Sequence, residues 1–110
     1  MRGENLGELE ELVLLTIGII YQEAYGVSIR EELFSQTGRR INISAIHSVL
    51  RRLEDKGFAE SYMGGSTADR GGRRKRLFSL TALGKQVLKE SIELRNRMYN
   101  TIPNIAWDIR

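Results

Sequence analysis

Cysteine is absent from the 110-residue chain, which excludes disulfide frameworks, thiolate metal sites and thiol nucleophiles and agrees with a reducing cytoplasm. Histidine occurs once, at His47, so neither a second imidazole nor a thiolate can complete a zinc site or a nucleophile–base pair. We find no pair of carboxylates with a distinctive spacing and no phosphate-binding glycine loop. The sequence therefore predicts a protein that is not an enzyme and that uses no metal or cofactor.

A long hydrophobic run is missing as well. The most apolar stretch, Leu12–Tyr21, is far shorter than the roughly 18 residues that a membrane span needs. Glu8, Glu10 and Glu11 precede it, where a secretory signal would carry positive charge. We therefore expect this stretch to be a helix in the core of a soluble, cytoplasmic protein without a membrane partner.

Charge is distributed unevenly along the chain. Residues 1–38 carry two Arg and seven Glu, a net charge of −5, whereas residues 39–80 carry ten Lys or Arg and four Asp or Glu, a net charge of +6. Residues 81–110 add +2, and the three segments sum to the overall +3. A basic middle in a modestly charged chain points to a localised contact with a polyanion.

Hydrophobic periodicity predicts three helices in the first half of the chain, at Leu6–Ala24, Val27–Thr37 and Ser44–Lys56. Gly38 and Gly57 follow the second and third, as glycine commonly does just past a helix end. Either Ser44 or Asn42 can cap the start of the third. We expect the second helix to turn three apolar side chains to the core: Ile29, Leu33 and Phe34.

A hairpin and a last helix complete the chain. Two strands are expected at Phe58–Met63 and Arg73–Leu80, around a loop, Gly64–Gly72, that holds four glycines in nine residues. Thr81 is a good N-cap for a final helix that Pro103 should kink or end. The predicted fold class is mainly α with a small β-hairpin, a winged helix-turn-helix with one additional C-terminal helix.

The third helix has two distinct faces at about 100° per residue. One face is apolar and should pack on the core: Ile46, Val49, Leu50 and Leu53. The opposite face consists of Ser44, Ser48, Arg51 and Asp55, with His47 and Arg52 on its flanks. Small residues let a helix N-terminus approach DNA closely, and Arg51 or Arg52 can bind guanine or phosphate. The alternative is a solvated helix whose arginines balance Glu54 and Asp55.

The hairpin favours the DNA interpretation. Five of its seven residues between 70 and 76 are cationic: Arg70, Arg73, Arg74, Lys75 and Arg76. Such clustering is self-repulsive in a free protein, and phosphate would relieve the repulsion. Tyr25 and Tyr62 can donate hydroxyl hydrogen bonds to phosphate or simply pack. The alternatives for the hairpin are a solubilising loop or a surface that docks an acidic partner protein, which would make the chain a winged-helix protein-interaction module.

Three motifs give the chain a family resemblance. They are Tyr25-Gly26 before the second helix, Leu50-Arg51-Arg52-Leu53-Glu54-Asp55-Lys56-Gly57 at the end of the third, and Leu80-Thr81-Ala82-Leu83-Gly84 after the hairpin. In this combination the chain resembles the PadR-like family of bacterial winged-helix transcription regulators over about residues 9–88. It departs from the family pattern at His47, where tyrosine is usual, and at Leu77, where an aromatic residue is common.

The resemblance implies a homodimeric repressor bound to a pseudo-palindromic operator in double-stranded DNA. Residues 1–80 would form the DNA-binding domain and residues 81–110 a dimerisation helix and tail. The family's DNA contacts would fall on Ser44, His47, Ser48 and Arg51 of the third helix and on Arg73 and Lys75 near the wing. Together with the neighbouring residues, the predicted DNA-binding set is Ser44, Ala45, His47, Ser48, Arg51, Arg52, Arg70, Arg73, Arg74, Lys75, Arg76 and Tyr25. The dimer interface would include Leu88, Ile92, Arg95, Met98, Tyr99 and Ile102. Because some relatives bind aromatic effectors, Trp107 could line such a site; otherwise it packs on the first helix of either subunit.

Overall fold

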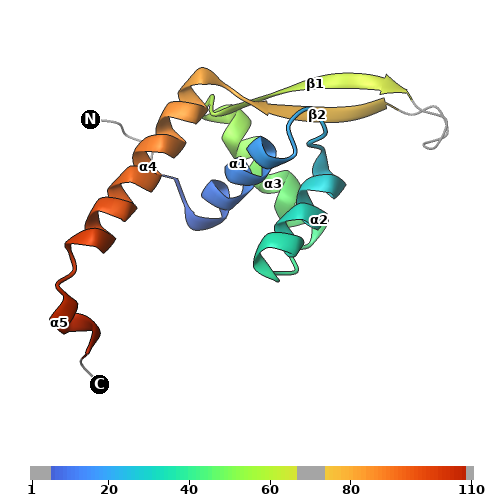
Figure 1. Ribbon diagram of the computed structural model, residues 1–110. Coiled ribbons are helices and arrows are strands. Elements are labelled where there is room, and N and C mark those ends of the chain that lie inside the picture. The colour runs from blue at the N-terminus through green and yellow to red at the C-terminus, as the bar shows by residue number, and fades with distance from the viewer. Residues whose placement is uncertain (1–5, 67–73, 109–110) are drawn as a thin grey trace.

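The computed structural model describes residues 6–66 and 74–108. A three-helix body carries a two-stranded antiparallel hairpin, and a long helix extends from the body as an arm (Figure 1). The elements are α1 (Glu8–Ile19), α2 (Gly26–Thr37), α3 (Ile43–Asp55), β1 (Ala59–Ser66), β2 (Arg74–Leu80), α4 (Ala82–Thr101) and α5 (Asn104–Trp107). This is the mainly α, winged helix-turn-helix fold that the sequence predicts. None of the helices in the described part of the chain is long and apolar enough to cross a membrane.

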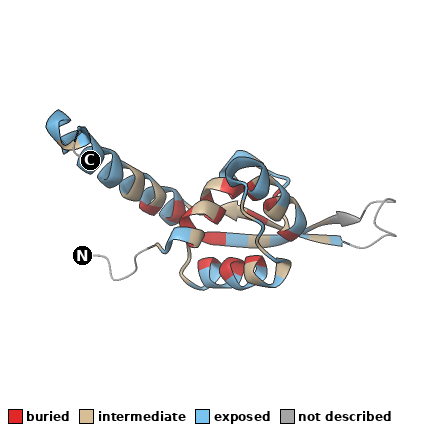
Figure 2. Ribbon diagram, turned by 90° about the horizontal axis from the view of Figure 1, so that it is seen from below, coloured by how far each residue is buried: buried red, intermediate tan, exposed pale blue. Residues whose placement is uncertain are grey.

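The hydrophobic core lies where α1, α2 and α3 meet beneath the hairpin (Figure 2). The fully buried side chains are Val13, Leu14 and Ile17 of α1, Ile29 and Leu33 of α2, and Ile46, Val49, Leu50 and Leu53 of α3. Phe58, between α3 and β1, and Phe78 of β2 close the core from the hairpin side. The core thus fixes α3 in place through the four apolar positions that its periodicity predicts.

The first helix is shorter than the sequence predicts, because it ends at Ile19 and not at Ala24. The chain turns at Gln22, whose φ of 68° lies in the left-handed region. Ala24 is buried, and its carbonyl accepts a hydrogen bond of 2.8 Å from the backbone N–H of Phe78 in β2. This hydrogen bond joins the segment after α1 to the hairpin.

The second helix confirms two of its three expected core residues and corrects the third. Ile29 and Leu33 are fully buried, but Phe34 is 40% exposed. Phe34 lies about 100° around the helix from Leu33 and therefore points past the core. Its ring instead packs beneath the guanidinium of Arg40, which lies 4.6 Å from the ring centroid.

The hairpin begins and bends differently from the prediction. Phe58 precedes β1 and donates its N–H to the carbonyl of Leu53, so it closes α3 rather than opening the strand. β1 continues beyond Met63 to Ser66, with an irregular register between them. Gly64 was expected to start the loop, but a Cβ there would lie 2.7 Å from Cδ1 of Leu77. Glycine therefore permits close strand packing at this position.

The last helix begins with the predicted cap. Oγ1 of Thr81 accepts a hydrogen bond of 2.9 Å from the N–H of Gly84 and donates one of 2.6 Å to the carbonyl of Gly57. α4 ends at Thr101, just before Pro103, and the short α5 after it was not predicted. Beyond Arg95, which pairs with Glu11 of α1, α4 leaves the body, and the molecule reaches 59 Å along its longest axis (Figure 1).

Candidate nucleic-acid interface

The outward face of α3 carries the side chains that the sequence predicts. Ser44, His47, Ser48 and Arg51 are exposed and Ala45 is partly exposed, opposite the buried apolar face. Asn42, one of the two expected N-caps, accepts a hydrogen bond of 2.8 Å at Oδ1 from the N–H of Ala45. Because Asn42 and not Ser44 caps α3, the hydroxyl of Ser44 is not used as the cap, and the first turn of α3 presents small polar side chains to the outside.

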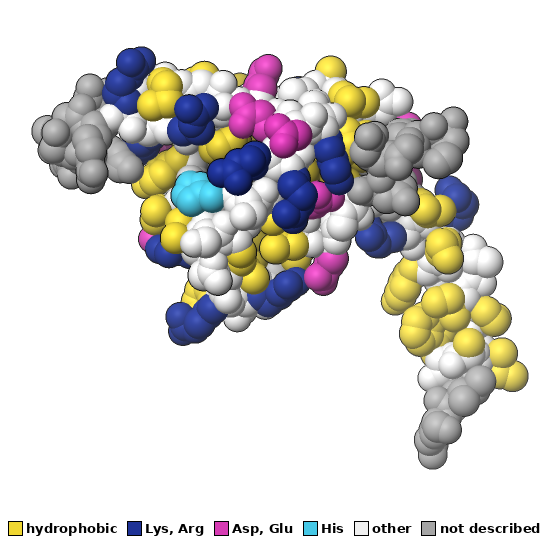
Figure 3. Space-filling view, turned by 180° about the vertical axis from the view of Figure 1, so that it is seen from behind, with side chains coloured by type: hydrophobic (Ala, Val, Ile, Leu, Met, Phe, Trp, Pro, Cys, Tyr) yellow, Lys and Arg dark blue, Asp and Glu magenta, His cyan; other side chains and the backbone are white. Residues whose placement is uncertain are grey.

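His47 lies where this face meets the start of α2. A Cβ on Gly26 would stand 2.7 Å from Cε1 of His47, so the helix start and the imidazole are in close contact. The one histidine of the chain is nevertheless at the surface, with cationic side chains beside it (Figure 3). Gly26 therefore serves the interface by letting α2 approach the flank of α3.

Arg52 has a role that the sequence did not reveal. Its Nε lies 3.2 Å from Oε2 of Glu10 in α1, and Nζ of Lys56 lies 3.0 Å from Oε1 of the same carboxylate. Glu10 is only 5% exposed and also accepts a hydrogen bond of 2.8 Å from the N–H of Gly7. Arg52 thus ties α3 to α1, whereas Arg51 has no such partner among the described residues. The sequence predicted the same DNA contact for either Arg51 or Arg52, whereas the structure distinguishes them by the ion pair that Arg52 makes with α1.

Burial raises the pKa of the Glu10 carboxyl, but hydrogen bonds from Gly7, Lys56 and Arg52 and the charge of Lys56 outweigh burial, so the pKa is lowered overall. A group whose pKa is lower in the folded than in the unfolded state stabilises the fold above its unfolded pKa. That stabilisation is lost as the pH falls through the folded pKa. The clamp that holds α3 on α1 is therefore intact at neutral pH and weakened by acid.

The first prediction follows from this clamp. Glu10→Gln should lower the free energy of unfolding at neutral pH by about 1.5–3 kcal/mol, because hydrogen bonds to a buried charged group are lost. Urea denaturation followed by circular dichroism measures the change. The loss should shrink as the pH is lowered through the acidic range, where the wild-type carboxylate becomes protonated.

Glu8→Gln is the matched control, since the Glu8 side chain is 75% exposed and pairs with Arg39 at the surface. We expect at most a few tenths of a kcal/mol from it. Equal losses in the two variants, or a loss in Glu10→Gln that does not depend on pH, would show that the clamp contributes little.

The described part of the wing carries three of the predicted cations. Arg74 and Arg76 are exposed, with Nε of Arg74 3.1 Å from the carbonyl oxygen of Gly64 and Nη1 of Arg76 2.9 Å from Oγ of Ser61. Arg70 and Arg73, also predicted to bind DNA, lie outside the described residues. To the residues that the structure describes, Arg74 and Arg76 each make one such bond, which leaves their other guanidinium N–H donors without a partner in those ranges.

Lys75 and Tyr25 contact each other, which the sequence did not predict. Nζ of Lys75 lies 4.4 Å from the centroid of the Tyr25 ring, a cation–π arrangement. Both side chains are partly buried, and together they join the hairpin to the start of α2. Their contact positions the wing beside α2 and α3.

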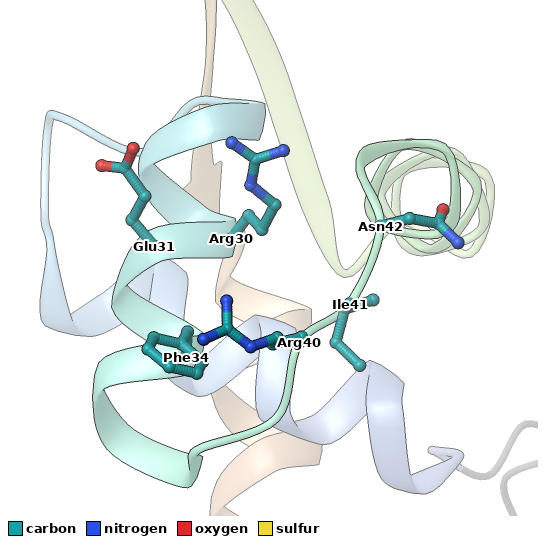
Figure 4. A pocket seen from close by; sticks show the side chains of 6 residues that line it. All are labelled: Arg30, Glu31, Phe34, Arg40, Ile41 and Asn42. Carbon is teal, nitrogen blue, oxygen red and sulfur yellow. The ribbon is translucent and has the colours of Figure 1, made fainter.

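Arg30 and Arg40 were not among the predicted site residues. They line a hollow of about 470 Å³ between α2 and the start of α3, together with Glu31, Phe34, Ile41 and Asn42 (Figure 4). The available signal in the sequence was the pair Arg39-Arg40, which lies four residues before the predicted third helix.

The predicted dimer residues divide into three kinds. Leu88 packs against the core and Ile92 is partly buried, whereas Met98, Tyr99 and Ile102 are exposed on the arm. Arg95 also has a partner that the sequence did not reveal, since Nη1 of Arg95 pairs with the buried Glu11 carboxylate of the same chain. This ion pair braces α4 against α1.

Trp107 is the last residue of α5, which lies at the far end of the arm, away from α1 (Figure 1). It is 56% exposed, and its ring centroid is 5.6 Å from that of Tyr99, with the planes tilted by 52°. Within the described ranges no group of three or more His, Asp or Glu side chains is arranged to hold a metal ion.

Comparison with known proteins gives one family match. The model of the transcriptional regulator PadR-like family matches residues 13–90, well over half of the 110-residue chain. This range contains α2, α3, the hairpin and the first two turns of α4. A search of curated proteins found no match.

Solved structures with the same fold include several bacterial regulators. A PadR-like transcriptional regulator from Bacillus cereus is 20% identical, with a TM-score of 0.72 over 89% of this chain and 90% of that one. A Streptococcus transcriptional regulator is 23% identical, with a TM-score of 0.71 over 89% and 91%. A PadR family regulator from Clostridium difficile is 20% identical, with a TM-score of 0.68 over 86% and 93%. At these identities the likeness establishes a common fold over nearly the whole length of each chain.

Proposed function

We propose that this chain, which belongs to the transcriptional regulator PadR-like family, is a homodimeric repressor. In this proposal α3 contacts the bases of the operator and the wing binds the DNA phosphate backbone. Membership of the family makes it a DNA-binding transcription regulator and not an enzyme. The assignment of repressor, of dimer and of individual contacts is the proposal. Bound in this way, it would keep polymerase from the promoter.

One observation carries the proposal: an exposed, small-residue face of α3 lies next to a cationic hairpin. Arg76 donates to Ser61, and Oγ of Ser61 donates a hydrogen bond of 2.6 Å to Glu54 near the end of α3. This chain of bonds holds the hairpin close to the helix. A helix of this kind fits the major groove, and cations beside it reach the flanking phosphates or the minor groove.

The arm supports the homodimer. Apolar side chains gather along it (Figure 3), and those that are exposed between residues 94 and 107 are Leu94, Met98, Tyr99, Ile102, Ile105 and Trp107. An apolar stripe on a projecting helix favours association with a second copy. Two copies would present two α3 helices to successive major grooves, about 34 Å apart on a pseudo-palindrome.

An aromatic effector is the second part of the proposal. Tyr99 and Trp107 form a tilted pair that leaves more than half of each side chain exposed. Their faces suit stacking with a planar aromatic molecule between two subunits. Ligand-dependent release from DNA would be measured as loss of operator binding when the aromatic compound is added.

The test of base recognition is Arg51→Ala. If Arg51 reads a base, the variant should lose about 1–3 kcal/mol of discrimination between its operator and a random duplex. Competition binding, monitored by fluorescence anisotropy on DNA from the region upstream of the gene, measures this difference. The control is Arg97→Ala, which removes the same charge from the exposed surface of α4.

An equal loss on operator and random DNA would reduce Arg51 to a phosphate contact. The rival hypothesis, a winged-helix module that docks an acidic protein, predicts that wild-type protein produces no footprint on its upstream DNA. A footprint that weakens steeply with salt would exclude that rival.

A further inference from the structure

The hollow between α2 and α3 has a cationic side chain on each side. Arg30 extends from α2, and Arg40 extends from the segment that enters α3 (Figure 4). Among the residues that the structure describes, neither guanidinium has a carboxylate within ion-pair distance. Two guanidinium groups are thus held beside the same open space without a charge to neutralise them.

Phe34 explains how Arg40 is held there. The guanidinium stacks 4.6 Å from the ring centroid, and the ring itself is 40% exposed. An aromatic platform restricts the arginine while leaving its in-plane N–H donors free, since stacking uses only the face of the group. Phe34, which is unnecessary to the core, therefore acts as a positioning residue.

Glu31 is the one acidic residue of the hollow, and its carboxylate points away from both guanidinium groups (Figure 4). It therefore does not occupy the place where an anion would lie. Asn42, the N-cap of α3, forms the opposite edge. The hollow thus borders directly on the first turn of α3, where Ser44 is exposed.

We propose that Arg30 and Arg40 form a second binding site for DNA phosphates, at the N-terminal end of α3. This inference rests on the proposed function, in which α3 lies in a major groove. The wing follows the C-terminal end of α3, so its cations contact the backbone at one end of the helix. The DNA backbone that passes the other end would meet the hollow, where positive charge and free N–H donors match a phosphodiester.

Phosphate contacts at this site should make a defined contribution to DNA affinity and to its salt dependence. A phosphate contact carries no base information, so it adds affinity for every sequence alike. Each neutralised phosphate releases counterions and adds about 0.9 to the slope of log K against log salt concentration. Two arginines in a subunit should therefore contribute about two contacts and a slope of roughly 1.8.

The experiment compares the wild type with Arg30→Ala/Arg40→Ala on a random duplex and on upstream DNA, over a series of salt concentrations. We expect the variant to bind both duplexes about tenfold or more weakly and with a smaller salt slope, while the ratio of the two affinities stays unchanged. Arg30→Lys/Arg40→Lys should keep most of the slope. Phe34→Leu, which keeps both charges, should weaken binding by a smaller factor. The control for lost surface charge is again Arg97→Ala.

Thermal unfolding of each variant checks that the fold is retained, which we expect because Arg40 is exposed and Arg30 is only partly buried. A salt slope that is unchanged in the double alanine variant, while the wild type binds DNA, would overturn this site alone. The site would also be overturned if inorganic phosphate bound to the two guanidinium groups of the wild type while its affinity for DNA stayed unchanged. Failure of the wild type to bind any duplex would instead overturn the proposed function.

Discussion

Alanine at position 84 should destabilise the protein by about 3 kcal/mol or more, among the largest effects of any single methyl group in this fold. A Cβ on Gly84 would stand 1.9 Å from the carbonyl oxygen of Phe58 and 2.8 Å from its carbonyl carbon. These are backbone atoms and cannot rotate away. The same carbonyl accepts the N–H of Thr81 at 3.1 Å, so moving it would also disturb the cap of α4.

This contact explains in physical terms why glycine follows threonine by three positions in the motif Leu80-Thr81-Ala82-Leu83-Gly84. Thr81 caps α4 and bonds to Gly57, while Gly84, one turn later, lets the helix lie directly on the backbone at Phe58. Phe58 in turn closes the core beneath the hairpin. The motif therefore joins the arm to the winged domain.

Thermal unfolding followed by circular dichroism tests the effect, and a fall in Tm of about 10 °C or more is expected. Gly18→Ala is the matched control, because its Cβ would lie at an ordinary 3.5 Å from Leu80 and the residue is inside α1. Alanine in a helix interior should stabilise by up to about 1 kcal/mol. A Gly84→Ala protein as stable as the wild type would contradict the close packing of α4 on Phe58.

Charge on the arm should abolish dimerisation. In Leu94→Glu/Met98→Glu, two residues on one face of α4 that are 45% and 63% exposed would each gain a carboxylate. Burying these charges in an apolar interface without partners is strongly unfavourable. Analytical ultracentrifugation should therefore find a monomer. Operator affinity should fall by about 100-fold or more, because each half-site is then bound without help from the other.

Asn100→Glu provides the control, since the exposed position 100 lies on the opposite side of α4 from Met98 and Ile102, about 200° from each. It adds the same charge to the same helix and should leave both the dimer and DNA binding intact. If the double variant remained a dimer, the subunits would have to associate through another surface.

The orientation of α3 could be predicted because its signal is local. Four apolar residues at helical spacing determine which side is buried, and Ser44, Ser48 and Arg51 necessarily face the other way. The cap at Thr81 and the stop at Gly38 are equally local and were predicted for the same reason. Where the fold follows from periodicity and capping, the sequence was sufficient.

The sequence was insufficient where distant parts of the chain meet. Arg52 was predicted to bind DNA and Arg95 to lie in the dimer interface, but the sequence did not predict that they pair with Glu10 and Glu11, which lie 42 and 84 positions earlier in the chain. The chain between α1 and α2 bonds to β2 through Ala24, and no local signal announces that partner. Acidic residues at the start of a helix are usually solvated, so their burial could not be expected from pattern alone.

The most direct test of the central claim is the affinity of the wild-type protein for duplexes from its own upstream region and for scrambled duplexes of equal length, across a range of salt concentrations. The account predicts tighter binding to one upstream duplex, and affinity that falls steeply with salt for both kinds of DNA. Binding that is equal for all duplexes, or absent at low salt, would contradict the assignment of α3 and the wing as a sequence-specific DNA interface.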